Sequence, residues 1–151
     1  MTKIVRVAGE NYSRFRDMVF WRENGVERAP VQERAPEGVL RAFAQGLRVY
    51  AAEEGGRFVG WIALAYIPKV SRFPGPGYVY VDELWVQEGY RRRGIGSALL
   101  KTADDWAEEL GAVGVRLYVN AQNPGAQRMY EQCGFRQDGT AHFMEKERMG
   151  R

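Results

Sequence analysis

Residues 82–100 read DELWVQEGYRRRGIGSALL, and the sequence on both sides of this stretch decides what it folds into. Apolar and polar side chains alternate over residues 78–86, which predicts a strand. A polar turn then leads to three consecutive arginines and to Gly94-Ile95-Gly96, and apolar side chains recur at helical intervals over residues 95–110. The stretch therefore predicts a strand, a basic glycine loop and the first turn of a helix.

This junction has the chemistry of an anion-binding site. Gly94 and Gly96 let the backbone approach a ligand closely, and the first N–H groups of a helix carry the positive end of its dipole. Arg91, Arg92 and Arg93 add charge, because a guanidinium can hold a phosphate through two parallel hydrogen bonds. The loop matches neither a Walker loop nor the three-glycine dinucleotide fingerprint. We therefore expect it to bind a diphosphate.

The rest of the chain predicts an α/β (α+β) fold in which a mixed, mostly antiparallel sheet is flanked by helices. Glu54-Gly55-Gly56 lies between two apolar segments and favours a hairpin. Further strands are expected at residues 3–8, 47–53, 57–66, 115–120, 135–137 and 140–145. Further helices are expected at residues 11–23, from residue 36 onward and at residues 124–133.

Composition limits the classes of function. The 151 residues are 45% hydrophobic and 27% charged, which is typical of one globular domain. The net charge of +3 is no larger than the three arginines supply, so we expect no broad basic face for nucleic acid. No apolar run is long enough to span a membrane and the N-terminus does not resemble a signal peptide, so a cytoplasmic location is expected. The single Cys133 and single His142 exclude an internal disulfide and make a metal cluster unexpected.

Two separated motifs resemble those of the GCN5-related N-acetyltransferase (GNAT) family. The strand that ends Leu84-Trp85-Val86, followed by the Arg-x-x-Gly-x-Gly loop, resembles the acyl-CoA-binding motif of that family. Residues 120–135, NAQNPGAQRMYEQCGF, resemble its later motif, with an asparagine before a helix, a tyrosine within it and a Gly-Phe pair after it. The resemblance covers residues 58–146, and it implies one domain over residues 1–151 whose fourth and fifth strands splay apart.

The resemblance implies acetyl-CoA as co-substrate, without a metal, and it assigns roles to particular residues. Asn123 would reach the pantetheine arm, and Tyr130 would face the thioester sulfur. In the gap between the splayed strands, the acyl and pantetheine portions would contact the backbone of Leu84, Trp85 and Val86. The diphosphate would be held by the loop residues Arg91, Arg92, Arg93, Gly94, Ile95, Gly96 and Ser97.

Acyl transfer to an amine requires three groups: a base for the ammonium proton, donors for the tetrahedral oxyanion and an acid for the leaving thiolate. Tyr130 is the candidate acid. Glu83 is the candidate base, and the strand period places its neighbour Asp82 on the opposite face. A surface carboxylate or a proton path through water is an equal alternative, since the family has no fixed position for the base.

We therefore expect an acetyl-CoA-dependent N-acetyltransferase that moves an acetyl group directly to a primary amine of a small molecule, peptide or protein. The alternative is a non-catalytic CoA-binding sensor or interaction module of the same fold. The resemblance also suggests a homodimer, and no nucleic-acid or membrane partner is expected.

The acceptor is not defined by the sequence. Aromatic residues, together with the loop at residues 68–77, either line an acceptor cleft or belong to the core; they are Tyr12, Phe15, Phe20, Trp21, Tyr66 and Tyr78. Acidic residues either attract a cationic amine or are ordinary solvated charges; they are Glu23, Glu27, Glu33 and Glu37.

Overall fold

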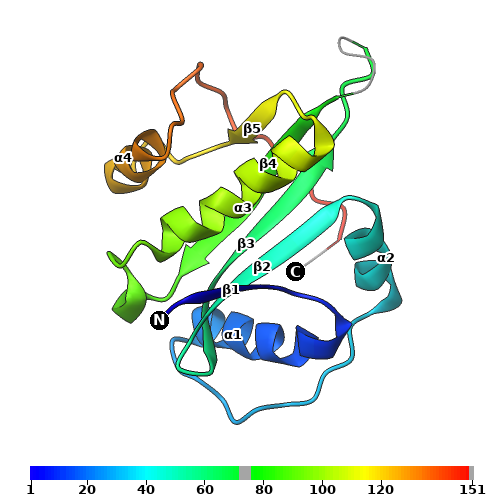
Figure 1. Ribbon diagram of the computed structural model, residues 1–151, viewed down its shortest axis with the longest axis vertical. Helices are drawn as coiled ribbons and strands as arrows, with labels where there is room; N and C mark the ends of the chain where they lie inside the picture. Colours follow the sequence, from blue (N-terminus) through cyan, green and yellow to red (C-terminus); the bar gives the residue numbers. More distant parts are fainter. Residues whose placement is uncertain (72–75, 150–151) are drawn as a thin grey trace. The chain divides into compact units, whose positions relative to one another are not determined.

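A five-stranded sheet organises the first part of the chain (Figure 1). The computed structural model describes residues 1–71 and 76–149, which fall into two units, Met1–Tyr118 and Val119–Arg151. The sheet belongs to the first unit and has the strand order β1-β2-β3-β4-β5. Its strands are β1 (Lys3–Arg6), β2 (Leu47–Glu54), β3 (Arg57–Ile67), β4 (Tyr78–Val86) and β5 (Gly114–Leu117).

The strand pairing confirms the predicted mixed, mostly antiparallel sheet. The first four strands pair with one another antiparallel, and β5 pairs with β4 in parallel. The turn between β2 and β3 consists of Gly55 and Gly56, with φ of 60° and 80°. A two-residue hairpin with both central residues at positive φ strongly favours glycine, which explains the Gly-Gly pair.

Three helices pack against this sheet. They are α1 (Tyr12–Asn24), α2 (Glu37–Gln45) and α3 (Ile95–Leu110). The last of these packs on β2, β3 and β4, runs along the strands in Figure 1, and supplies the connection that a parallel β4–β5 pair requires. Helix α1 packs on β3, and α2 packs on β2.

Alternation along β3 sorts its side chains between the two faces of the sheet. Trp61 and Ala63 join the core that contains Met18 and Val19 of α1, so their side of the sheet is the α1 face. Ile62 and Leu64 point to the other side and are fully buried. Leu99 and Ala103 of α3, which are equally buried, cover that second face.

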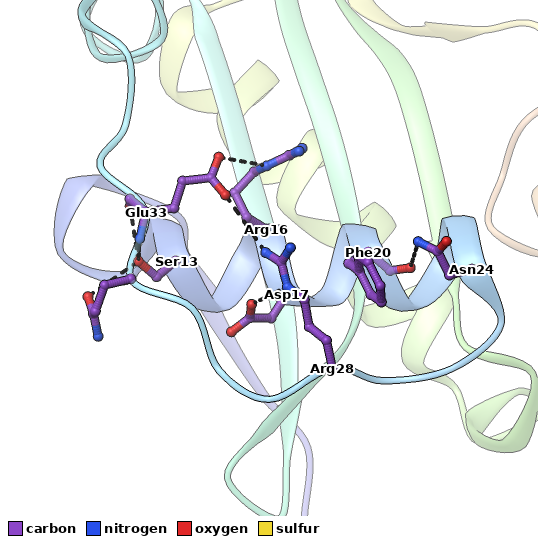
Figure 2. Close-up of polar contacts among 8 residues, drawn as sticks. Ser13, Arg16, Asp17, Phe20, Asn24, Arg28 and Glu33 are labelled. Carbon is purple, nitrogen blue, oxygen red and sulfur yellow. Dashed lines mark hydrogen bonds and ion pairs between the residues drawn. The ribbon is translucent and has the colours of Figure 1, made fainter.

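The segment at residues 25–36 is fixed to α1 by polar contacts (Figure 2). The Glu33 backbone N–H donates to Oγ of Ser13 at 2.7 Å, and that hydroxyl donates to the Glu33 carbonyl at 3.0 Å. The Glu33 carboxylate pairs with Arg16 and Arg28, and Arg28 also pairs with Asp17. Glu33 is therefore an internal ion-pair partner rather than a solvated attractor for an amine.

The second unit contains α4 (Pro124–Gln132). Residues 135–149 are all described and contain no strand, so the strands predicted at residues 135–137 and 140–145 are wrong. A strand needs a neighbour to accept and donate its backbone hydrogen bonds, and alternation in the sequence does not provide one. In the described part of the chain, no helix has the length and apolarity needed to cross a membrane.

Candidate active site

Strand β4 extends beyond the end of β5. The parallel ladder runs from Tyr78 with Gly114 to Val81 with Leu117, whereas β4 continues to Val86. Residues 83–86 remain paired with β3 on one side, and residues 82–86 have no β5 partner on the other. The backbone N–H and C=O groups on that open side can hydrogen-bond an extended ligand. The predicted splaying of the fourth and fifth strands lies here.

A β-bulge interrupts β4 where the β5 ladder ends. Leu64 of β3 pairs with Val81 and the preceding Ala63 pairs with Glu83, so Asp82 is the extra residue. A bulge re-aims side chains and breaks the period of two. The expectation that Asp82 and Glu83 point to opposite faces assumes an uninterrupted side-chain period of two, which the bulge breaks. Both side chains are exposed.

Glu83 lies on the α1 face of the sheet. One of its carboxylate oxygens accepts a hydrogen bond from Nε1 of Trp61 at 3.3 Å. Trp61 is buried in the α1-face core, whereas Glu83 itself is open to solvent. The candidate base is thus anchored at one oxygen, and the rest of its carboxylate can receive a proton.

The loop after β4 turns back on the end of that strand. Nε of Arg91 donates to the Val86 carbonyl at 2.9 Å. Between them, the side chain of Gln87 accepts from the Gly89 N–H at 2.6 Å and starts a short 3₁₀ turn, η2 (Glu88–Tyr90). These two contacts fix the path from the strand to the glycine loop.

Gly94 is the N-cap of α3 and adopts a left-handed conformation, with φ of 80°. A Cβ atom placed there would meet no atom within 4 Å, so the position favours glycine because of its backbone conformation rather than crowding. Gly94 also offers no side chain to cap the helix, and the first N–H groups of a helix point out of its N-terminus. The exposed loop therefore presents the positive end of α3 to solvent.

The three arginines of the loop are held differently. Arg91 bonds the strand end, and Arg93 pairs with Glu54 at 2.7 Å while stacking on Tyr90. Arg92 adopts a positive φ of 63° and makes no hydrogen bond or ion pair with any residue that the structure describes. Its charge is the most available of the three for a bound anion.

In the second unit, the Asn-to-Phe motif forms a capped helix with a tyrosine held at its end. Oδ1 of Asn123 accepts from the Ala126 N–H at 3.1 Å and caps α4. The ring of Tyr130 packs edge-on against Phe135 at 5.8 Å, and the Phe135 N–H donates to the Tyr130 carbonyl. Gly134, with φ of 94°, makes this reversal. Burial raises the pKa of Tyr130, so its phenol keeps its proton at neutral pH.

Sequence reasoning missed part of the surroundings of Glu83. Trp61 and Trp85 are register partners on neighbouring strands, and their rings lie 5.1 Å apart on the α1 face. Arg22 of α1 stacks over Trp61 at 5.4 Å. The alternation within residues 57–66 and 78–86 predicts the side to which each tryptophan points. Only the register of the two strands places the tryptophans opposite each other. Conversely, Tyr12 is buried and Phe15 packs against the core, so neither lines a surface cleft.

Two further expectations about the acceptor side change with the structure. Glu27 pairs with Arg57 at 3.4 Å and so resembles Glu33 in having a partner within the chain. Part of the loop at residues 68–77, namely residues 72–75, lies outside the described residues.

Comparison with known proteins identifies the class. The model of the acetyltransferase (GNAT) family matches residues 15–135, so the chain belongs to that family. The resemblance seen in the two motifs is thereby confirmed.

Individual relatives agree with the family. Blasticidin-S acetyltransferase of Streptomyces morookaense is 32% identical over 113 residues, which are 74% of this chain and 70% of that protein. The uncharacterized N-acetyltransferase YhfO of Bacillus subtilis is 32% identical over 96 residues, 63% of each chain, so the match spans less than two thirds of that relative. An aminoglycoside acetyltransferase from an uncultured soil metagenomic sample has a similar fold, with a TM-score of 0.78, 18% identity and 97% coverage of both chains.

Proposed function

We propose that this chain is an acetyl-CoA-dependent N-acetyltransferase that moves an acetyl group directly to a primary amine. The observation that carries the proposal is the continuous path from the open side of β4 at residues 82–86 to the N-terminus of α3 at Gly94. An extended pantetheine arm suits the first part of this path. A diphosphate suits the second, because helix N-termini bind phosphate through backbone N–H groups.

The residues present fit such a donor. Leu84, Trp85 and Val86 lie on the part of β4 that has no β5 partner. Arg92 offers an uncommitted cation at the loop, with Gly94 keeping the helix end open. The diphosphate site would also include Arg91, Arg93, Ile95, Gly96 and Ser97.

The proposed chemistry divides three tasks among the residues. Glu83 accepts a proton from the attacking amine, and backbone N–H groups on the open side of β4 stabilise the oxyanion. Tyr130 donates a proton to the departing thiolate; burial raises the pKa of its phenol, which is therefore protonated at neutral pH. The role of Tyr130, like that of Asn123 toward the pantetheine arm, is supported by the motif at residues 120–135.

The acceptor class is broader than one compound. Blasticidin S and aminoglycosides are named for relatives or structural neighbours, and both support an amine on a small molecule. We also propose that the 151 residues act as one domain, in the cytoplasm, as a homodimer and without nucleic-acid or membrane partners. The alternative is a CoA-binding sensor without turnover.

Calorimetric titration with acetyl-CoA, CoA and ATP tests the donor site. Saturable binding of the first two compounds and not of ATP is expected, followed by release of free thiol when amines are added. Absence of acetyl-CoA binding would contradict the enzyme and the sensor together. Binding without turnover on any amine would favour the sensor.

A further inference from the structure

The α1 face of the sheet carries three neighbouring indole rings beside Glu83, which we call the tryptophan shelf: Trp21, Trp61 and Trp85. The rings of Trp61 and Trp85 lie 5.1 Å apart, and those of Trp21 and Trp85 lie 6.3 Å apart, edge to face. Trp61 is 1% exposed and forms the buried floor, whereas Trp21 and Trp85 are half-buried. The shelf is therefore a partly buried aromatic cluster on the side of β4 that carries Glu83.

Two opposite charges are held on Trp61. Glu83 accepts from its indole N–H at 3.3 Å, and the guanidinium of Arg22 lies over its ring at 5.4 Å. Both charged side chains are exposed, and they do not form an ion pair with each other. One ring thus carries a carboxylate and a guanidinium that do not pair with each other.

Arg22 differs from the other arginines of its helix. It lies in the last turn of α1, where the helix dipole favours a cation, and it pairs with no carboxylate among the described residues. Arg14 pairs with Glu53, and Arg16 pairs with Glu33. Stacking on an indole orients the planar guanidinium while leaving its N–H groups free to bind a carboxylate through two parallel bonds.

The geometry points to a zwitterionic ligand. A small molecule with both charges close together can make one charge-assisted hydrogen bond of about 2.8 Å to Glu83 and another to Arg22. Because Glu83 lies on β4 beside the proposed thioester site, the ammonium belongs at Glu83 and the carboxylate at Arg22. A polycationic acceptor such as an aminoglycoside would instead meet repulsion from Arg22.

We propose that the acceptor is a small amine that also carries a carboxylate, in the simplest case an α-amino acid; this rests on the proposed N-acetyltransferase function. The amine gives up a proton to Glu83, and its nitrogen attacks the thioester carbonyl. The nitrogen loses two protons in all: Glu83 takes the first, and the second, lost as the C–N bond forms, balances the proton that the thiolate takes up when the C–S bond breaks with its electron pair on sulfur. The products are an N-acetylamino acid and CoA.

The test compares matched acceptors on the full chain. The twenty common L-amino acids are assayed with acetyl-CoA, together with the α-amide and the decarboxylated amine of the best substrate, and with sisomicin. We expect kcat/KM for the amino acid to exceed that of its amide at least about tenfold, since a hydrogen-bonded charge is lost in the amide.

Arg22→Gln should raise KM for the amino acid by about tenfold or more while leaving KM for the amide and for acetyl-CoA unchanged. For Arg22→Lys, the KM for the amino acid should lie between those of the wild type and of Arg22→Gln, because lysine keeps the charge and lacks the planar pair of N–H donors. Arg57→Gln is the matched control: Arg57 stacks on Trp21 at 5.8 Å but already pairs with Glu27, so its loss should change neither KM.

Each contrary result has a definite meaning. Equal use of acid and amide, equal effects of Arg22→Gln on both, acetylation of sisomicin alone, or acetyl-CoA binding with no amino acid acetylated would overturn the zwitterion assignment and leave donor binding intact. Failure to bind acetyl-CoA in the calorimeter would instead remove the proposed function on which the assignment depends.

Discussion

At the scale of single residues, Tyr130 owes its properties to its immediate neighbours in the sequence. Gly134 reverses the chain so that Phe135 packs on the tyrosine ring, and burial raises the phenol pKa. The Gly-Phe pair therefore has a structural reason to follow the tyrosine, whether or not it contacts a substrate. A neutral phenol at the working pH is what a general acid requires.

Tyr130→Phe should lower kcat by about a hundredfold, the lower end of the usual contribution of general acid catalysis. The ring stays on Phe135, so the fold and the dissociation constant for acetyl-CoA should be unchanged. Steady-state kinetics with calorimetry on the same preparation make this measurement. An unaltered kcat would take the acid role away from Tyr130.

Glu83→Gln should also lower kcat by about a hundredfold, because the amide cannot accept the amine proton. The neighbouring Asp82→Asn is the control, since the bulge leaves both carboxylates exposed on consecutive positions. If the Asp82 variant loses more activity than the Glu83 variant, the base is Asp82. If neither loses activity, the proton leaves through water.

At the scale of elements, the loop between β4 and α3 combines one conformational requirement with three unequal charges. Gly94→Ala forces a side chain into the left-handed region and should lower the free energy of unfolding by about 1 kcal/mol. Gly38→Ala, within α2 and not at positive φ, should instead raise it by up to about 1 kcal/mol. Urea denaturation of both variants checks the pair, and equal effects would show that the backbone at Gly94 is unstrained.

Arg92→Ala should weaken acetyl-CoA binding about tenfold, by loss of a charged hydrogen bond. Arg93→Ala should weaken it less, because Arg93 is already shared with Glu54. Calorimetric dissociation constants at one fixed salt concentration compare the two. The reverse order would mean that Arg93 leaves Glu54 when the donor binds.

At the scale of the whole molecule, two tyrosines make the free energy of unfolding depend on pH in the alkaline range. Burial raises the pKa of Tyr130, while burial and then the charge of Asp82 raise that of Tyr80, both from an ordinary value of 10.0. The folded chain then holds more protons than the unfolded chain above pH 10.0, so the free energy of unfolding falls as pH rises from there. Urea denaturation of the wild type and of Tyr80→Phe between neutral pH and pH 11 measures this dependence. The free energy of unfolding should fall less steeply with pH for the variant, by a slope on the order of one proton.

Much of the fold could be predicted from the sequence, and the exceptions share one cause. The bounds of β4 and α3 follow from alternation and helical spacing between glycines, and the structure has them as predicted. By contrast, Tyr118 continues the alternation of β5 but lies outside it, because the ladder ends where the bulge at Asp82 begins. Bulges and strand partners depend on neighbours distant in the sequence, which local patterns do not contain.

The same limit applies to the candidate site. The glycine loop and the motif around Tyr130 are continuous in the chain and could be found by reading it. The pairing of Glu83 with Trp61, and of Trp61 with Arg22, joins three elements and depends on register and helix packing. The two charges proposed to bind the acceptor are therefore visible in the sequence as single residues but not as a pair.

The hydrogen bond from Arg91 to the Val86 carbonyl fixes the end of β4 relative to the loop at residues 91–97, so that the two act as a molecular ruler for the proposed donor. A carbonyl oxygen has two lone pairs, so this group can accept from a ligand amide while Arg91 stays in place. The spacing between the reacting end of a donor and its anionic end is then set by the protein rather than by the ligand. A thioester on a truncated carrier would satisfy one end of the ruler and miss the other, which would make the full length of the carrier part of its recognition.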